Sequence, residues 1–176
     1  WIEDQDFWRL SGIFRDVYLL TVPASHVFDV RCVSTLENEY KDGVLTVETD
    51  VLNPENCEIE IRLYDGKTLI GSKKQAASEK TEAEFTVKDV RKWNAEEPNL
   101  YYVNVLLIKD GRILEVQRVR VGFKKIEIRD QQLFVNGVSI KLKGVNHHDT
   151  HPTKGYVMSE EDIRLDLSRM KKLNIN

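Results

Sequence analysis

The chain has 176 residues, of which 41% are hydrophobic and 31% are charged, which predicts a globular protein with one domain or one and a half. Its formal net charge of -3 gives no positive field to hold a polyanion, so we expect no nucleic-acid partner. It also has no apolar run near the roughly 18 residues that span a bilayer and no signal-peptide pattern, so we expect no membrane partner.

The amino-terminal stretch begins with Trp1 instead of Met, and we expect both ends of the chain to be boundaries within a longer protein. Residues 8–17 carry two basic and two aromatic residues around Gly12. Residues 17–22 then predict a strand that leads into the next domain. The alternative for this stretch is an edge strand whose arginines pair with local acids.

From Pro23 onward, short segments carry apolar residues at every second position, which predicts strands with one buried face. These segments are residues 27–33, 44–51, 59–64, 83–87, 101–108 and 113–121. Asp110-Gly111 predicts a two-residue hairpin, because type I′ turns need positive φ at both centres. Roughly six or seven strands in about 100 residues predict an immunoglobulin-like β-sandwich over residues 23–123.

Aromatic and sulfur-containing side chains of this region have ordinary structural explanations. We expect Trp93, Tyr101 and Tyr102 to be core and corner residues of the sandwich, with sugar stacking as the alternative. Cys32 and Cys57 are too few for a disulfide scaffold or a zinc knuckle, and we expect them to be buried thiols.

Beyond residue 123 the pattern changes to that of a strand pair followed by a helix. Residues 126–128 and 133–135 predict the pair, Asn136-Gly137 predicts a type I′ turn, and residues 138–145 predict a further strand. Ser159 and Asp162 have the spacing of a capping box, and acids follow Ser159 at the positive end of the helix dipole. One apolar stripe follows, made of Ile163, Leu167 and Met170. Residues 124–176 thus predict the first βα unit of a larger α/β domain.

Three of the four histidines, His147, His148 and His151, follow the predicted strand 138–145. Strand ends of this kind are where α/β enzymes build active sites. The alternative is a zinc site made of the histidines with Asp149. His26 is expected to be a surface or turn residue.

Three stretches, in order, resemble the β-galactosidases of glycoside hydrolase family 2. Residues 3–17 (EDQDFWRLSGIFRDV) resemble the end of the family's jelly-roll sugar-binding domain, and this stretch separates β-galactosidases from β-glucuronidases. Trp93 with residues 97–101 (EPNLY) resembles the tail of its immunoglobulin-like domain. Residues 121–123, 133–137 and 143–148 resemble the entry into its catalytic barrel, and the final residues 174–176 fit the approach to its His-Tyr-Pro signature.

The resemblance implies an all-β fold class, an immunoglobulin-like β-sandwich with a C-terminal β-hairpin and helix that begin a truncated (β/α)8 barrel. The implied domains are the end of the jelly-roll domain (residues 1–22), the sandwich (23–123) and the start of the catalytic TIM barrel (124–176). The β-galactosidases of this family hydrolyse terminal β-D-galactosides with retention, using an acid/base glutamate and a nucleophilic glutamate about 5 Å apart. Both glutamates are expected beyond Asn176.

The chain alone is therefore expected to contain no catalytic residue, to be inactive and to act as a structural linker. Its one Asn-Glu pair, Asn38-Glu39, lacks the family's Trp and Gly context and is expected to be a surface turn. The alternative function is a stand-alone immunoglobulin-like carbohydrate-binding or adhesion module.

Two substrate-binding residues follow from the resemblance. Asp6 matches the aspartate that holds Na+ in the galactose pocket near the sugar's 6-hydroxyl, with Asp4 as its rival on spacing alone. A hard cation prefers such oxygen ligands. His148 matches the histidine that contacts the sugar hydroxyls. His147 stands where the family commonly has Arg and Thr150 where it commonly has His, which leaves the neighbouring subsite contacts open.

The resemblance also implies Mg2+ and Na+ as cofactors of the longer protein, neither fully coordinated by this chain. The implied partners are the remaining domains of that protein, its galactoside substrate and further copies in a homo-oligomer. A cytoplasmic location is expected ahead of a periplasmic or secreted one.

Overall fold

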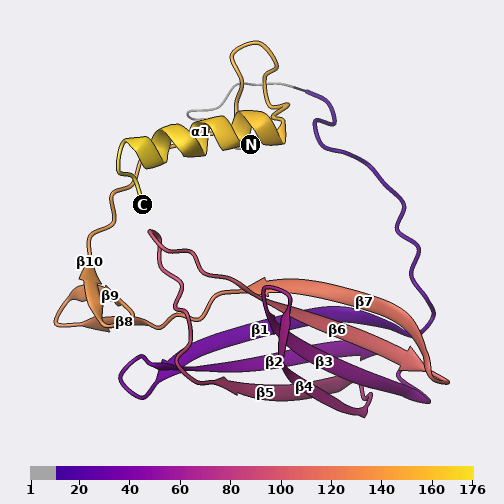
Figure 1. Cartoon of the computed structure of the whole chain (residues 1–176). Helices are drawn as coiled ribbons and strands as arrows, with labels where there is room; N and C mark the ends of the chain where they lie inside the picture. The colour runs from indigo at the N-terminus through magenta and orange to yellow at the C-terminus, as the bar shows by residue number, and fades with distance from the viewer. Residues whose placement is uncertain (1–10) are drawn as a thin grey trace. The chain divides into compact units, whose positions relative to one another are not determined.

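A computed structural model describes residues 11–176 (Figure 1). These residues form two compact units. The larger unit is Thr21–Ile140, and the smaller one combines the described residues up to Leu20 with Lys141–Asn176.

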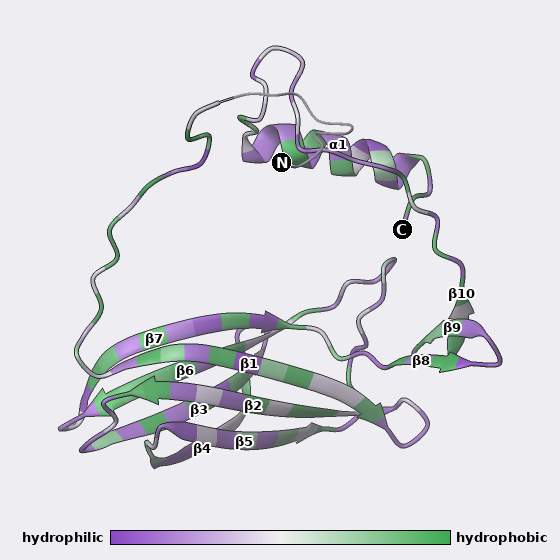
Figure 2. Ribbon diagram, turned by 180° about the vertical axis from the view of Figure 1, so that it is seen from behind, coloured by the Kyte–Doolittle hydropathy of each residue, from purple (hydrophilic) through white to green (hydrophobic). Residues whose placement is uncertain are grey.

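Seven strands of the larger unit form a two-layer β-sandwich (Figure 1). One sheet has the order β1-β2-β5 and the other β4-β3-β6-β7, and every pairing is antiparallel. The strands are β1 (His26–Glu37), β2 (Asp42–Leu52), β3 (Cys57–Asp65), β4 (Thr68–Ala76), β5 (Lys80–Val87), β6 (Tyr101–Lys109) and β7 (Arg112–Val121). This confirms the immunoglobulin-like sandwich predicted from period-two patterning, which Figure 2 shows as alternating hydrophilic and hydrophobic bands along the strands.

One strand, β4, was not among the predicted segments. It lies at the edge of its sheet beside β3, and almost all of its side chains are exposed. An edge strand that buries little has no need of alternating apolar residues, so its sequence carries no period-two signal.

The core lies between the two sheets, where alternate side chains of β2, β3 and β6 meet. Phe123, which is fully buried, closes one end of this core and packs edge-on against Tyr101 with ring centroids 5.0 Å apart. Gly43 lies directly against Phe123, since a Cβ at this position would be 2.4 Å from the Cδ1 atom of the ring. Glycine is therefore required at residue 43 for close approach.

The predicted corner residue is Tyr101. Its side chain is 2% exposed, and its hydroxyl accepts a 3.0 Å hydrogen bond from the backbone N–H of Arg91. This is the tyrosine corner typical of immunoglobulin-like sandwiches. Trp93 is half-buried at the end of the sandwich, where its backbone N–H donates to the Phe123 carbonyl. The prediction was wrong for Tyr102, which alternates with Tyr101 onto the outer face and lies 5.2 Å from the Arg118 guanidinium.

A three-stranded antiparallel sheet follows the sandwich in the same unit, with the order β10-β9-β8. Its strands are β8 (Ile126–Arg129), β9 (Gln132–Val135) and β10 (Val138–Ile140). The predicted type I′ turn is confirmed, because Asn136 and Gly137 have φ of 52° and 81°. The predicted strand 138–145 was too long: β10 ends at Ile140, and residues 141–150 have no regular secondary structure.

The smaller unit contains helix α1 (Glu160–Lys172). Ser159 is its N-cap and forms the predicted capping box, in which the Ser159 Oγ accepts from the Asp162 N–H and the Asp162 carboxylate accepts from the Ser159 N–H. The expected apolar stripe is present in the sequence, but none of the side chains of α1 is buried.

The strand expected over residues 17–22 is absent from the structure. Val17 and Leu19 are 81% and 101% exposed. A strand exists only where a neighbour completes its hydrogen bonds, and the described residues provide none here. Among residues 11–176, no helix combines the length and the apolar character that a membrane crossing requires.

Candidate functional site

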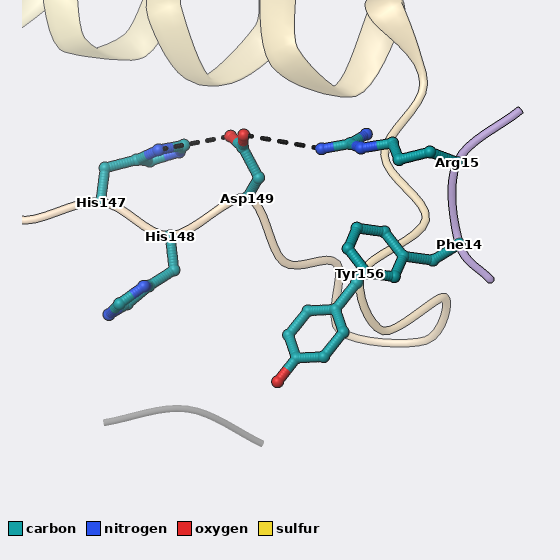
Figure 3. Close-up of a pocket in the computed structure, with 6 residues that line it drawn as sticks. All are labelled: Phe14, Arg15, His147, His148, Asp149 and Tyr156. Carbon is teal, nitrogen blue, oxygen red and sulfur yellow. Dashed lines mark ion pairs between the residues drawn. The ribbon is translucent and has the colours of Figure 1, made fainter. Parts of the chain in front are cut away.

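A cavity of about 360 Å³ lies in the smaller unit (Figure 3). Six residues line it, from the amino-terminal segment and from the region after β10: Phe14, Arg15, His147, His148, Asp149 and Tyr156. Two of the three clustered histidines therefore line one cavity.

The side chains of residues 147–149 point alternately to two sides (Figure 3). His147 and Asp149 point toward α1 and Arg15, whereas His148 points to the opposite side, where the hydroxyl of Tyr156 also points. His148 and its two neighbours therefore all line the cavity, with their side chains on opposite sides of the loop.

A series of basic and acidic side chains follows the side of the loop that faces α1 (Figure 3). Asp149 Oδ2 lies 4.0 Å from Arg15 Nη2, and Asp149 Oδ1 lies 3.7 Å from His147 Nδ1. The other ring nitrogen of His147, Nε2, lies 3.5 Å from Asp166 Oδ2 on α1. Asp166 is in turn 3.8 Å from Arg169. His147 therefore lies between two carboxylates, each of which also faces an arginine.

Aromatic rings form the apolar wall of the cavity. Phe14 and Tyr156 have ring centroids 5.6 Å apart with a 54° tilt, an arrangement that aromatic pairs favour. Tyr156 is 9% exposed and is the one buried side chain among the described residues of the smaller unit. A sugar has apolar ring faces and polar edges, and a wall of this kind beside His148 can contact both.

His151 has a different role from the other two clustered histidines. Its backbone forms paired hydrogen bonds of 2.7 and 3.1 Å with Gly155, and its Nδ1 accepts from the Thr153 N–H. Its Nε2 lies 3.8 Å from Asp162. His151 therefore closes a short loop against the start of α1 and does not line the cavity.

Asp162 is the acid at the centre of that loop-to-helix contact. The Lys154 ammonium, 2.7 Å away, and the Ser159 N–H hold the pKa of this carboxyl well below its usual range. Asp162 is therefore ionised near neutrality and cannot act as a proton donor there.

The zinc alternative gains no support from this geometry. His147 faces Asp149 and Asp166, whereas His151 faces Asp162. Within residues 11–176, no three or more His, Cys, Asp or Glu side chains gather in a way that could hold a metal ion.

Other residues singled out in the sequence lie away from the cavity. Glu39 is 88% exposed in the turn between β1 and β2, which confirms that Asn38-Glu39 is a surface turn. His26 is at the start of β1 with its ring 3.0 Å from the Pro23 carbonyl oxygen. Both cysteines are free thiols, and burial raises the pKa of Cys32 to about 11, so this thiol is unreactive near neutrality.

Of the two predicted substrate-binding residues, His148 lines the cavity, and its sugar contact stays a prediction. Asp6 and its rival Asp4 lie outside the described residues. The sequence reasoning missed Phe14, Arg15 and Tyr156 as cavity residues, and it considered Asp149 only as a partner of the histidines in a zinc site. The aromatic and basic pair after Gly12 could have indicated the first two, whereas Tyr156 carried no signal.

Solved structures share this fold. Bacteroides uniformis β-glucuronidase 3 superposes with a TM-score of 0.86 at 23% identity, covering 98% of this chain and 22% of that one. Parabacteroides merdae β-glucuronidase gives a TM-score of 0.79 at 24% identity, covering 88% of this chain and 20% of that one. At this identity the likeness defines the fold, a sandwich domain that continues into the start of a second domain.

Sequence comparison defines the family. Residues 25–124 match the model of glycosyl hydrolases family 2, and residues 126–176 match that of the family's TIM barrel domain. The chain belongs to glycosyl hydrolases family 2.

Curated relatives are similar over the whole chain. The β-galactosidase of Photobacterium profundum is 38% identical over 189 residues, and that of Priestia megaterium is 39% identical over 191. The β-galactosidase of Clostridium acetobutylicum is 37% identical over 179 residues. These matches cover 100% of this chain but only 18–20% of the relatives, so the chain spans about a fifth of their length.

Proposed function

We propose that these residues are part of a β-galactosidase that hydrolyses terminal β-D-galactosides with retention of configuration. The observation that supports it is the similarity of the whole chain to β-galactosidases at 36–39% identity, including the stretch that carries Asp6 and the loop that carries His148. The chain contributes the end of a sugar-binding domain, an immunoglobulin-like linker and the first βα unit of the barrel. The two catalytic glutamates belong to other parts of the longer protein.

His148 has the chemistry for a sugar-contacting residue. An imidazole can donate to or accept from a hydroxyl group, and His148 lines a cavity with an aromatic wall. A contact that strengthens as the sugar ring flattens toward the oxocarbenium-like transition state lowers the barrier to hydrolysis. We therefore assign to His148 a contact made mainly in the transition state.

Charge supports a galactoside over a glucuronide. A glucuronide carries a carboxylate where a galactoside has its 6-hydroxyl group. Among the described cavity residues, the cation of Arg15 faces the carboxylate of Asp149. The assigned position of Asp6 near C6 would repel a uronate and suit Na+ or a hydroxyl group. Mg2+, the remaining domains and a homo-oligomeric state are proposed for the longer protein, and no residue of this chain is assigned to Mg2+.

The test is a comparison of two substrates with the protein encoded by the complete reading frame. We expect turnover of o-nitrophenyl β-galactoside and none of p-nitrophenyl β-glucuronide. His148→Ala should lower kcat/KM for the galactoside about tenfold or more, the effect of losing one hydrogen bond in the transition state. The opposite substrate preference would exclude the proposal.

The 176-residue chain alone provides a second test. We expect it to release no o-nitrophenol above the buffer background and to give no heat of binding with galactose or lactose. Micromolar, saturable binding by this chain would favour a stand-alone carbohydrate-binding module instead.

A further inference from the structure

We propose that Asp149 is a positioning residue that fixes the direction of the His148 side chain by anchoring the loop on its other side. The inference rests on the proposed role of His148 in binding the sugar. Asp149 also lines the cavity, but its side chain lies on the opposite side of the loop from that of His148 (Figure 3).

The loop needs such an anchor because its backbone provides few of its own. Residues 141–150 have no regular secondary structure. Among bonds between described residues, the backbone of 147–150 takes part in one, of 2.8 Å, from the Thr150 N–H to the His148 carbonyl. The side chains of residues 147–149 point alternately to two sides (Figure 3), so holding His147 and Asp149 on one side directs His148 to the other.

Asp149 is the residue that connects the loop to a distant part of the chain. One of its oxygens faces Arg15 of the amino-terminal segment at 4.0 Å, and the other faces His147 at 3.7 Å. Asp166 holds His147 against α1 but is not paired with Arg15 in the structure. Loss of the Asp149 charge would therefore release both contacts at once.

The energetic argument depends on the network and not on one pair. The side chains of Arg15 and Asp149 are 56% and 51% exposed, and a single ion pair with that exposure contributes little. Shared partners reduce the conformational entropy lost per contact, because a side chain ordered by one partner is already in place for the next. The effect of Asp149 should accordingly appear as loss of order at His148 and not as loss of the fold.

The first test uses the 176-residue chain with isotope-labelled histidines, of which there are only four. Their ring signals in NMR spectra can be assigned by replacing each histidine with glutamine. Asp149→Asn removes the charge and keeps the shape of the side chain. We expect it to shift or broaden the signals of His147 and His148 while His26 is unchanged. In the separate variant Asp149→Glu, which keeps a carboxylate, the signals of His147 and His148 should stay close to those of the wild type. Asp110→Asn in the β6–β7 turn is the matched control.

The second test is kinetic and uses the longer protein. Asp149→Asn should lower kcat for o-nitrophenyl β-galactoside about tenfold with a smaller change in KM, a coupling in the range found for residues in contact. The same substitution in a His148→Ala background should have little further effect. A merely structural role would lower both backgrounds equally.

The outcomes separate the two proposals. If the wild type hydrolyses the galactoside but Asp149→Asn retains full kcat, the positioning role is wrong and the proposed function stands. If the wild type hydrolyses no galactoside, the proposed function fails, and the NMR signals of His148 decide the positioning role alone. If the NMR signals of His148 are unchanged in Asp149→Asn, the positioning role of Asp149 is wrong.

Discussion

The hydroxyl of Tyr40 donates a 2.7 Å hydrogen bond to Glu127, 87 residues further along the chain. Tyr40 belongs to the β1–β2 turn, where it and the two residues before it have φ of 63°, 54° and 48°. Its ring packs on Gly137, where a Cβ would be 2.7 Å from Tyr40 Cε2. Non-glycine residues seldom adopt positive φ, so three in succession indicate a turn held by its contacts. The contact joins the sandwich to the β8–β10 sheet.

Tyr40→Phe tests this junction. The variant keeps the ring and loses the hydrogen bond to Glu127, so amides of β8 and β9 should exchange with deuterium faster. The seven strands of the sandwich should exchange at an unchanged rate, because their core does not include the hydroxyl group. Tyr18→Phe, at a position 79% exposed, is the matched control. Equal exchange rates in wild type and Tyr40→Phe would contradict the assignment.

The same pair predicts a pH dependence. The Tyr40 hydroxyl lowers the pKa of Glu127, and Glu127 raises the pKa of Tyr40. Because the pKa of Glu127 is lower in the folded state, the pair stabilises the fold fully above about pH 4.3, the pKa of Glu in an unfolded chain. This stabilisation is lost as the pH falls through the pKa that Glu127 has in the folded state. Because the pKa of Tyr40 is higher in the folded state, the pair also stabilises the fold fully below about pH 10, the pKa of Tyr in an unfolded chain. This stabilisation is lost as the pH rises through the pKa that Tyr40 has in the folded state.

We therefore expect the difference in thermal stability between wild type and Tyr40→Phe to be constant from about pH 5 to 9 and to shrink on both sides. Melting temperatures measured across this range provide the check. A difference in melting temperature that grew at acid or alkaline pH would contradict the predicted directions of the two pKa shifts.

Tyr101→Phe should destabilise the sandwich by about 1 kcal/mol, because the backbone N–H of Arg91 loses its acceptor at a partly buried position. The ring and its packing against Phe123 remain, so the fold should be unchanged by circular dichroism. Urea unfolding with unchanged m-value would give the difference in free energy. Tyr102→Phe, on the outer face of the same strand, should have a much smaller effect.

Gly43→Ala should also destabilise the sandwich, by about 1–3 kcal/mol, because the added methyl group would overlap the Phe123 ring. Gly144→Ala is the control, since a Cβ there has no heavy atom within 4 Å. Calorimetric melting of the two variants should separate them. A loss of stability in Gly144→Ala without one in Gly43→Ala would contradict the predicted overlap with Phe123.

Much of the fold could be predicted from local sequence. Alternation predicted six of the seven sandwich strands, and Asn136-Gly137 and the Ser159–Asp162 spacing predicted a turn and a helix start. These features depend on residues within a few positions of one another. The failures concern strands whose partners decide them: β4 at a sheet edge, residues 17–22, and the overlong strand after residue 138. Hydrogen bonds to a neighbour, and not the segment's own pattern, determine whether these form.

The sequence by itself determined the class of sandwich, the family motifs and His148 as a residue of interest, because periodicity, turn chemistry and ordered motifs are local. Only the tertiary structure decided that Tyr40 meets Glu127, that Arg15 meets Asp149, and that Tyr156 walls the cavity. Each of these contacts joins separate segments or depends on how a loop folds. Side-chain pairs of this kind have no spacing rule, since chain folding and packing alone bring their atoms together.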